Sequence, residues 1–225
     1  MSSPGEARSE SRALVISRDT PVIFVVDDDV SVRESLELLI LSADWQPETF
    51  ESAEEFLQHP RIDGPSCLVL DVTLPNLTGL DLQQRLIDRA DMPVIFITGY
   101  GDVPTTVKAM KAGAVEFLTK PFGGDLLLDA IGHAIERSRT ALAHQAELRA
   151  LRDCHASLTP RERETMALVV SGLLNKQIAA RLGISEITVK AHRGRVMRKM
   201  GVDSLAGLVR VAAALDVPLV ADPRY

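Results

Sequence analysis

The sequence predicts an α/β domain with a parallel sheet, followed by a smaller all-α domain. Up to about residue 135, short apolar runs alternate with helical patterns, which is typical of βαβ units. Beyond that point the patterns are helical only. Residues 1–154 carry 14 Lys and Arg against 25 Asp and Glu, whereas residues 155–225 carry 11 against 6. An acidic first domain and a basic second domain favour a polyanionic partner for the second.

Composition narrows the class of protein. A chain of 225 residues is long enough for two modest domains. It contains no apolar run long enough to span a membrane, and the apolar patch at 13–16 is too short for a signal peptide. We expect residues 1–20 to be a disordered extension. Cys67 and Cys154 match no disulfide or metal spacing, so we expect free thiols in a cytoplasmic protein without a membrane partner.

Five strands are expected in the first domain. Most of their residues are apolar, as in parallel strands that are covered on both faces. Their expected ranges are 22–26, 46–50, 66–70, 94–98 and 116–118. Between them we expect helices over 31–41, 52–58, 79–89 and 103–112. Ser52 and Glu55 have the spacing of a capping box at the second of these helices.

Polar residues follow the strands at the points where they end. Asp27 and Asp28 follow the first strand, Asp71 the third and Lys120 the fifth, while Thr98 ends the fourth. The carboxyl ends of parallel strands share one edge, where open α/β sheets bind ligands. Three acids, a hydroxyl and a lysine at one edge suit an aspartyl phosphate. Asp71 would be the nucleophile, a cation on Asp28 would offset phosphoryl charge, and Lys120 and Thr98 would contact phosphoryl oxygens.

A structural reading of the same acids remains open. Asp27, Asp28 and Asp29 also fit a solvated loop in which Asp29 caps the following helix. Asp71 taken alone fits a loop carboxylate that caps the next helix. The phosphoryl reading therefore rests on the convergence of the set rather than on any single residue.

Four segments in fixed order resemble the receiver domain of two-component response regulators, over residues 22–135. They are VVDDD at 25–29, LVLDVTLPNLTG at 68–79, ITGYGD at 97–102 and AGAVEFLTKPF at 112–122. The resemblance implies a flavodoxin-like, doubly wound sheet of order 2-1-3-4-5 in a receiver domain over 21–135. It also implies phosphorylation of Asp71 by a sensor histidine kinase.

The same resemblance implies further site residues. Mg²⁺, or another divalent cation, would be held by Asp28, Asp71 and the backbone carbonyl of Thr73, with Asp27 acting through water. Thr98 and Phe117 would form the switch pair. The bond before Pro121 would be cis. Apart from the resemblance, the bulk of Tyr100 leads us to expect that it covers the phosphoryl group and slows its hydrolysis.

A long helix is expected over 123–153, and we assign 136–157 as a helical linker. One reading of the linker is a short dimer seam. The leucines that would form it are Leu142, Leu148 and Leu151. Ser138 and Gln145 interrupt a clean heptad, so a solvated linker helix is an equal alternative.

The last part of the chain reads as four helices. Their expected ranges are 160–171, 175–182, 185–200 and 204–215. Thr159 and Glu162 predict a capped start for the first, and residues 183–185 form the tight joint of a helix-turn-helix. The segments LTPRERE, NKQIAARLGIS and TVKAHRGRVMRKMGV resemble the DNA-binding domain of the NarL/FixJ (LuxR-type) regulators. We therefore assign 158–225 to a LuxR-type helix-turn-helix domain.

Helical projection of 185–200 predicts which residues face DNA. Val189, Val196 and Met200 share the inner stripe, and Arg193 falls with them. We expect Arg193 to pair with an acid such as Glu162 or Glu164. The residues expected at the DNA are Thr188, Lys190, Ala191, Gly194, Arg195 and Arg198.

Together these readings predict a FixJ-like transcriptional regulator rather than an enzyme. Phosphorylation of Asp71 would control homodimerisation and the binding of two recognition helices to promoter DNA. A haloacid-dehalogenase-like phosphatase would also use a strand-end Asp, but it needs an Asp two residues on, where Thr73 stands. An adaptor that signals by protein contact alone is the other rival class. DNA binding that depends on operator sequence distinguishes it from a regulator.

Overall fold

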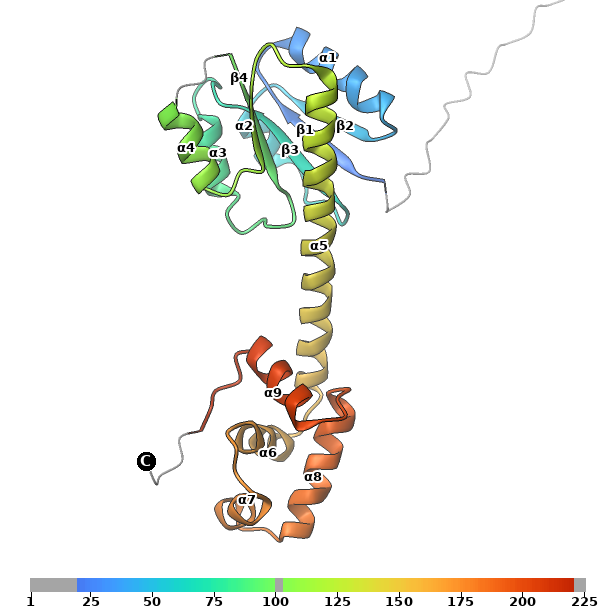
Figure 1. The fold of residues 1–225 in the computed structure, drawn as a ribbon, viewed down its shortest axis with the longest axis vertical. Helices are drawn as coiled ribbons and strands as arrows, with labels where there is room; N and C mark the ends of the chain where they lie inside the picture. Colours follow the sequence, from blue (N-terminus) through green and yellow to red (C-terminus); the bar gives the residue numbers. More distant parts are fainter. Residues whose placement is uncertain (1–19, 100–102, 221–225) are drawn as a thin grey trace, which may run out of the picture. The chain divides into compact units, whose positions relative to one another are not determined.

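The computed structural model describes residues 20–99 and 103–220 (Figure 1). Contacts divide the chain into two compact units, Met1–Leu142 and Ala143–Tyr225. The expected N-terminal extension, apart from Thr20, and Tyr100 lie outside the described residues. No helix within the described ranges combines the length and apolar character needed to cross a bilayer.

The first unit contains a parallel sheet of order β2-β1-β3-β4-β5, as expected. Its strands are β1 (Val22–Val26), β2 (Gln46–Phe50), β3 (Ser66–Asp71), β4 (Val94–Thr98) and β5 (Glu116–Thr119). The helices packed on it are α1 (Val30–Ser42), α2 (Ala53–Gln58), α3 (Gly79–Arg85), α4 (Val103–Lys111) and the first part of α5 (Gly124–Ala156). Because both sheet faces are covered, β1, β3 and β4 are buried at every position.

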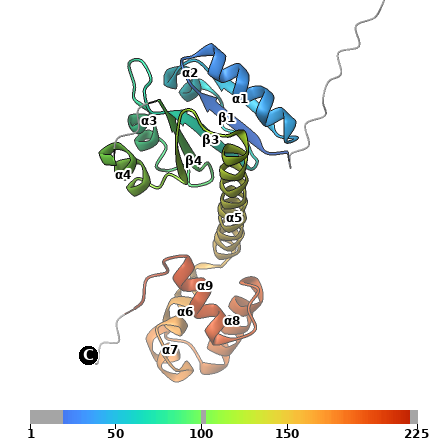
Figure 2. The ribbon, with the colours of Figure 1, turned by 45° about the horizontal axis from the view of Figure 1, so that its top comes forward.

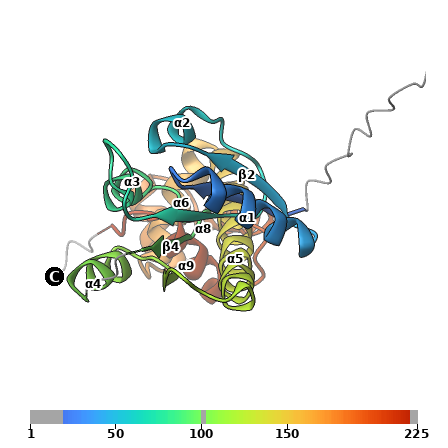
Figure 3. The same ribbon diagram turned by 90° about the horizontal axis from the view of Figure 1, so that it is seen from above.

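Two helix layers enclose this sheet (Figure 2). On one face, Phe56 of α2, Leu82 of α3 and Ala109 of α4 pack in one cluster with alternate strand residues. On the other face, Ile40 of α1 and Ile131 of α5 pack with the intervening ones. All five strands run in one direction, so their carboxyl ends lie along one edge, which Figure 3 views.

Two helices differ from expectation, α2 in its cap and α3 in its length. Ser52 Oγ accepts from the Glu55 N–H, but the Glu55 carboxylate accepts from the N–H of Glu51. The reciprocal half of the expected capping box is therefore wrong. Helix α3 ends at Arg85, not at residue 89, because turns with bonds such as Leu86 N–H to Gln83 O replace the helical pattern.

Helix α5 is anchored to the sheet beyond its apolar stripe. Ser138 is fully buried, accepts a hydrogen bond from the Ser66 N–H at 3.0 Å and donates to the Asp91 carbonyl. Ser66 is the first residue of β3, and Asp91 precedes β4. The receiver contacts of α5 thus continue past Ile135, and Ser138 has a role that no heptad position describes.

The second unit packs four helices around one apolar cluster. They are α6 (Pro160–Val170), α7 (Asn175–Leu182), α8 (Glu186–Lys199) and α9 (Leu205–Ala214). The expected capping box at α6 is confirmed, since Thr159 and Glu162 bond reciprocally. Gly183 ends α7 with φ +67°, a left-handed conformation that favours glycine and permits the tight joint to α8.

Candidate functional site

Three aspartates meet where β1 and β3 end. One carboxylate oxygen from each of Asp27, Asp28 and Asp71 lies within 4.8 Å of the other two. Asp27 and Asp71 are buried, with 0% and 6% of their surface exposed, whereas Asp28 is exposed. The adjacent Asp29 behaves differently. Its side chain accepts from the Ser31 N–H and caps α1, as in the structural alternative considered for these acids.

Lys120 connects the two buried aspartates. Its Nζ donates to Asp27 Oδ2 at 2.6 Å and to Asp71 Oδ2 at 2.7 Å. Burial alone would lower the pKa of Lys120, but the two carboxylates outweigh it and the pKa is raised. Burial raises the pKa of Asp27, against the lowering effect of Lys120. Arg33 Nη1 also donates to the Asp27 carbonyl at 2.6 Å. Two cations among three aspartates still leave an excess of negative charge in a partly buried site.

Backbone groups hold the remaining oxygens of the two buried carboxylates. Asp27 Oδ1 accepts from the Asp29 N–H at 3.0 Å, and Asp71 Oδ1 accepts from the Thr73 N–H at 2.8 Å. Gly79 allows the loop after β3 to close against the site. A Cβ at Gly79 would lie 2.3 Å from the Asp71 carbonyl oxygen, so only glycine fits this approach. The carboxylates are therefore fixed in position by the ends of the strands and by the loops that follow them.

The other expected receiver residues lie along the same strand ends. Thr98 is fully buried at the end of β4, and its carbonyl accepts from the Lys120 N–H at 2.7 Å. Phe117 on β5 is half-buried and packs against Phe96 of β4, with ring centroids 6.2 Å apart. Thr73 is exposed next to Asp71. The peptide bond between Lys120 and Pro121 is cis, as the resemblance implied.

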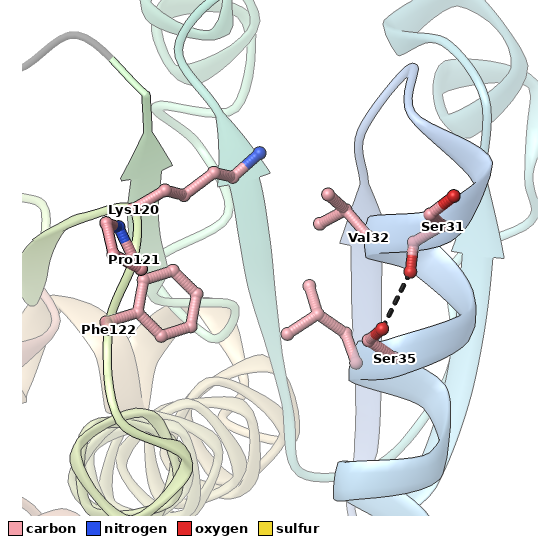
Figure 4. A pocket seen from close by; sticks show the side chains of 7 residues that line it. Ser31, Val32, Ser35, Lys120, Pro121 and Phe122 are labelled. Carbon is pink, nitrogen blue, oxygen red and sulfur yellow. Dashed lines mark hydrogen bonds between the residues drawn. The ribbon is translucent and has the colours of Figure 1, made fainter.

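A cavity of about 350 Å³ lies between the start of α1 and the loop after β5. Figure 4 shows Lys120 extending across it toward α1, with Pro121 and Phe122 on the same side. Ser31, Val32 and Ser35 line the opposite wall, where Ser35 Oγ donates to the Ser31 carbonyl at 2.8 Å. The lysine is thus reachable from outside the sheet.

The donor set at this edge fits a hard divalent cation. Mg²⁺ prefers carboxylate and carbonyl oxygens and keeps several of its waters. Asp27, Asp28 and Asp71 offer three carboxylates within reach of one ion. Their excess negative charge gives such an ion a reason to bind, and exposed Asp28 leaves room for its waters.

The residues expected at DNA share the outer side of α8. Lys190, Ala191, Gly194, Arg195 and Arg198 are all exposed, whereas Val189, Val196 and Met200 are buried, as the projection predicts. Thr188 is half-buried, and its hydroxyl lies 2.9 Å from Ser185 Oγ at the N-cap. Thr188 therefore orders the first turn of the helix.

The expected partner of Arg193 is wrong. Arg193 Nη1 donates to Asn175 Oδ1 at 2.7 Å and so joins α8 to the start of α7. Glu162 pairs instead with Lys199 at 2.7 Å, and Glu164 with Arg161 at 2.8 Å. The placement of Arg193 away from the outer face agrees with the projection, but its partner is an amide rather than an acid.

Ile187 was missed by sequence reasoning. It lies in the first turn of α8 with 79% of its surface exposed, whereas Val189 and Val196 of the same helix are buried. Its spacing from Lys190 and Ala191, three and four residues on, was the available signal.

Comparisons with known proteins identify the class. Residues 23–132 match the family model described as response regulator receiver domain, and residues 156–212 match the model described as bacterial regulatory proteins, luxR family. A receiver followed by a LuxR-type domain defines a DNA-binding response regulator of transcription.

Individual relatives narrow this class to a family. The chain is 50% identical to Nodulation protein W of Bradyrhizobium diazoefficiens, over 87% of each chain. It is 42% identical to the transcriptional regulatory protein FixJ of the same organism, over 84% of this chain and 93% of FixJ. A structure of the response regulator StyR covers 86% of the chain and 98% of StyR, with 46% identity and a TM-score of 0.74. The chain belongs to the FixJ-like, LuxR-type two-component response regulators.

Proposed function

We propose that Asp71 accepts a phosphoryl group from a sensor histidine kinase and that this modification controls promoter binding by the second unit. The observation that carries the proposal is the strand-end cluster, in which Lys120 bonds to Asp27 and Asp71 while Asp28 stays exposed beside them. Structural carboxylates in a protein interior are normally matched by as many partners. This cluster is not balanced internally, and a cation together with a phosphoryl group would balance it.

The chemistry assigns a task to each residue. An Asp71 oxygen forms a bond to phosphorus while the bond from phosphorus to the kinase histidine nitrogen breaks. Asp28, Asp71 and the Thr73 carbonyl would hold Mg²⁺, with Asp27 acting through water. When bound, this ion supplies positive charge that offsets the phosphoryl oxygens. Lys120 gives up its hydrogen bond to Asp71 and donates instead to a phosphoryl oxygen. The Thr98 hydroxyl donates a hydrogen bond to another phosphoryl oxygen.

The switch would run through β4 and β5. Thr98 ends β4, and Phe117 packs on Phe96, its register partner in the sheet, two residues before Thr98. Recruitment of the Thr98 hydroxyl to the phosphoryl group would let Phe117 change its packing and alter the face that α4 and β5 present. The receiver would then favour a homodimer. Ligands shift such an equilibrium only through contacts that differ between the two states, and Thr98 supplies one.

The dimer would present two copies of α8 to two half-sites of a promoter. Lys190, Arg195 and Arg198 supply positive charge along the outer side of this helix. Ala191 and Gly194 between them permit close approach to the groove. Since promoter DNA is the target, we place the protein in the cytoplasm.

The test compares the full chain before and after treatment with an acyl-phosphate donor and Mg²⁺. Molecular mass in solution is measured by light scattering, and DNA affinity by binding to duplexes that the treated protein enriches from a random pool. We expect treatment to raise both the dimer fraction and the affinity. Treatment that transfers a phosphoryl group but changes neither quantity would contradict the proposed control.

A further inference from the structure

We propose that Ile187 reads a thymine methyl group in the major groove and so determines operator sequence. This inference rests on the proposed function, in which the outer side of α8 enters that groove. Its starting point is an aliphatic side chain that the fold of the second unit does not use. Ile187 is 79% exposed, whereas Val189 and Val196 on the same helix are 0% and 1% exposed.

The position of Ile187 on α8 directs it to the same surface as the basic residues. At about 100° per residue, Ile187 projects between Lys190 and Ala191, and Gly194 follows two turns on. Ile187, Ala191 and Gly194 therefore form an apolar strip, which we call the α8 strip. Lys190 and Arg195 border it on its two sides.

Gly194 indicates that the shape of this strip suits an outside partner rather than the packing of the chain itself. A Cβ at Gly194 would meet nothing within 4 Å, so the fold of the chain itself does not require glycine there. Glycine in a helix interior is unfavourable relative to alanine. The strip thus rises at Ile187 and is flat at Gly194, with cations at its borders, which suits contact with a polyanion that approaches the helix backbone closely.

The first turn of α8 holds Ile187 in a defined orientation. Ser185 Oγ accepts from the Thr188 N–H at 3.1 Å and lies 2.9 Å from the Thr188 hydroxyl. The β-branched side chain of Ile187 has few χ1 options in a helix, so little freedom is lost on contact. Recognition helices of this motif place their N-terminal residues at base edges.

The chemistry of the groove then selects the target. Each base edge in the major groove offers hydrogen-bond donors or acceptors, and the C5-methyl of thymine is the one apolar group. An isoleucine side chain has no hydrogen-bonding atom and gains only from such a group. The structure therefore assigns Ile187 to a thymine in each half-site.

The experiment removes each side of the contact in turn, the thymine methyl group from the DNA and the isoleucine side chain from the protein. Full-length protein, treated with an acyl-phosphate donor and Mg²⁺, enriches duplexes from a random pool. The enriched duplex is then synthesised with thymine and with uracil, which lacks the methyl. Affinities are measured for the parent, for Ile187→Ala and for the control Leu38→Ala, which truncates a side chain that is 71% exposed on α1. All three chains are compared on both duplexes.

We expect uracil to weaken the parent about fourfold per half-site, the value for one buried methyl group, and to weaken Leu38→Ala equally. Ile187→Ala should bind both duplexes with the same, lower affinity. Discrimination retained by Ile187→Ala would overturn the inference and move the methyl contact elsewhere, for example to Ala191. Equal binding of the parent to both duplexes would overturn it while leaving the proposed DNA binding intact. A parent that enriches no duplex would overturn both.

Discussion

Each unit of this protein contains a lysine that bonds to a buried carboxylate, and the two lysines differ in what surrounds them. In the second unit, Lys199 faces one acid, Glu162, and also donates to the Ser157 carbonyl. In the first unit, Lys120 faces the cluster of three aspartates. The charges around Lys199 are matched, whereas those around Lys120 are not. A matched pair serves the fold, and an unmatched cluster has capacity for an external partner.

The largest effect is expected at the unmatched cluster. Asp71→Asn keeps the shape of the side chain but cannot form an acyl phosphate. We expect it to abolish phosphoryl uptake and the rise in DNA affinity that follows treatment with an acyl phosphate, measured by intact mass and by titration of the enriched duplex. Asp28→Ala should also lose uptake.

Asp29→Asn is the matched control. Asp29 adjoins the cluster in sequence but caps α1, and asparagine caps a helix equally well. Full uptake is expected for this variant. Equal loss in Asp29→Asn and Asp71→Asn would mean that general acidity, rather than the geometry of the cluster, governs phosphorylation.

At the matched pair we expect an effect on stability alone. Lys199→Met leaves the buried Glu162 carboxylate without its cation, and the melting temperature of the second unit should fall while phosphoryl uptake is unchanged. Adding Glu162→Gln should recover part of the loss, because the unpaired charge is then removed. Lys190→Met, an exposed lysine of the same helix, should leave the melting temperature unchanged, and a fall of the same size there would refute the distinction.

The pair also predicts a pH dependence. The hydrogen bond from Lys199, aided by that from the Thr159 N–H, lowers the pKa of Glu162 from 4.5 to about 2. A carboxyl with a lowered folded-state pKa contributes stability that is fully present above its unfolded pKa. That contribution is lost as pH falls from about 4.5 toward 2.

The difference in unfolding free energy between the parent and Glu162→Gln should therefore shrink as pH falls through this range. Denaturant titrations of the full chain, followed by helical circular dichroism, measure it. Glu164→Gln is the control, since that acid is exposed and pairs with Arg161 at the surface. A difference that stays constant with pH would contradict the cause given for the shift.

A smaller effect separates the two sides of α8. Lys190→Ala and Arg195→Ala should weaken operator binding by about 1–3 kcal/mol if they reach a guanine edge, without loss of stability. A phosphate contact would instead flatten the salt dependence by about one unit for all sequences. Arg193→Ala should lower stability by about 1 kcal/mol through loss of the Asn175 bond. Binding lost only in Arg193→Ala, with stability intact, would reverse the assignment.

The smallest effect is expected at the proposed switch. Thr98→Ala should take up a phosphoryl group normally but dimerise less in response, because it lacks the hydroxyl that would bond to a phosphoryl oxygen. Light scattering at matched phosphorylation measures this coupling. Thr119→Ala, on the residue paired with Thr98 in the sheet, is the control and should dimerise as the parent does. Equal dimerisation of all three proteins would locate the switch elsewhere.

Local patterns predicted most of the fold because the signals were local. Apolar strands, the Thr159 cap and the Gly183 joint each depend on a few neighbouring residues. Strand order and the cis bond before Pro121 came from the family resemblance instead. Contacts between distant segments could not be read in this way. Ser138 looked like an interruption in a heptad, yet it bonds to Ser66, 72 residues away.

The same limit applies to the site. Parallel strands made the meeting of Asp27, Asp71 and Lys120 predictable from position alone. The helical period placed Arg193 away from the outer side of α8, but not beside Asn175, since a partner is a property of packing. Gly79 was expected at the start of a helix, and only the structure reveals how closely it approaches the Asp71 carbonyl.

The central claim is that the unmatched cluster accepts a phosphoryl group on Asp71, and mapping that group tests it most directly. The full chain is treated with an acyl-phosphate donor and Mg²⁺, the acyl phosphate is reduced with borohydride, and the modified peptide is sequenced by mass spectrometry. We expect one modified residue, Asp71, and none when Mg²⁺ is removed by chelation. Modification of any other residue as the main product, or none in a folded chain supplied with Mg²⁺, would contradict the account.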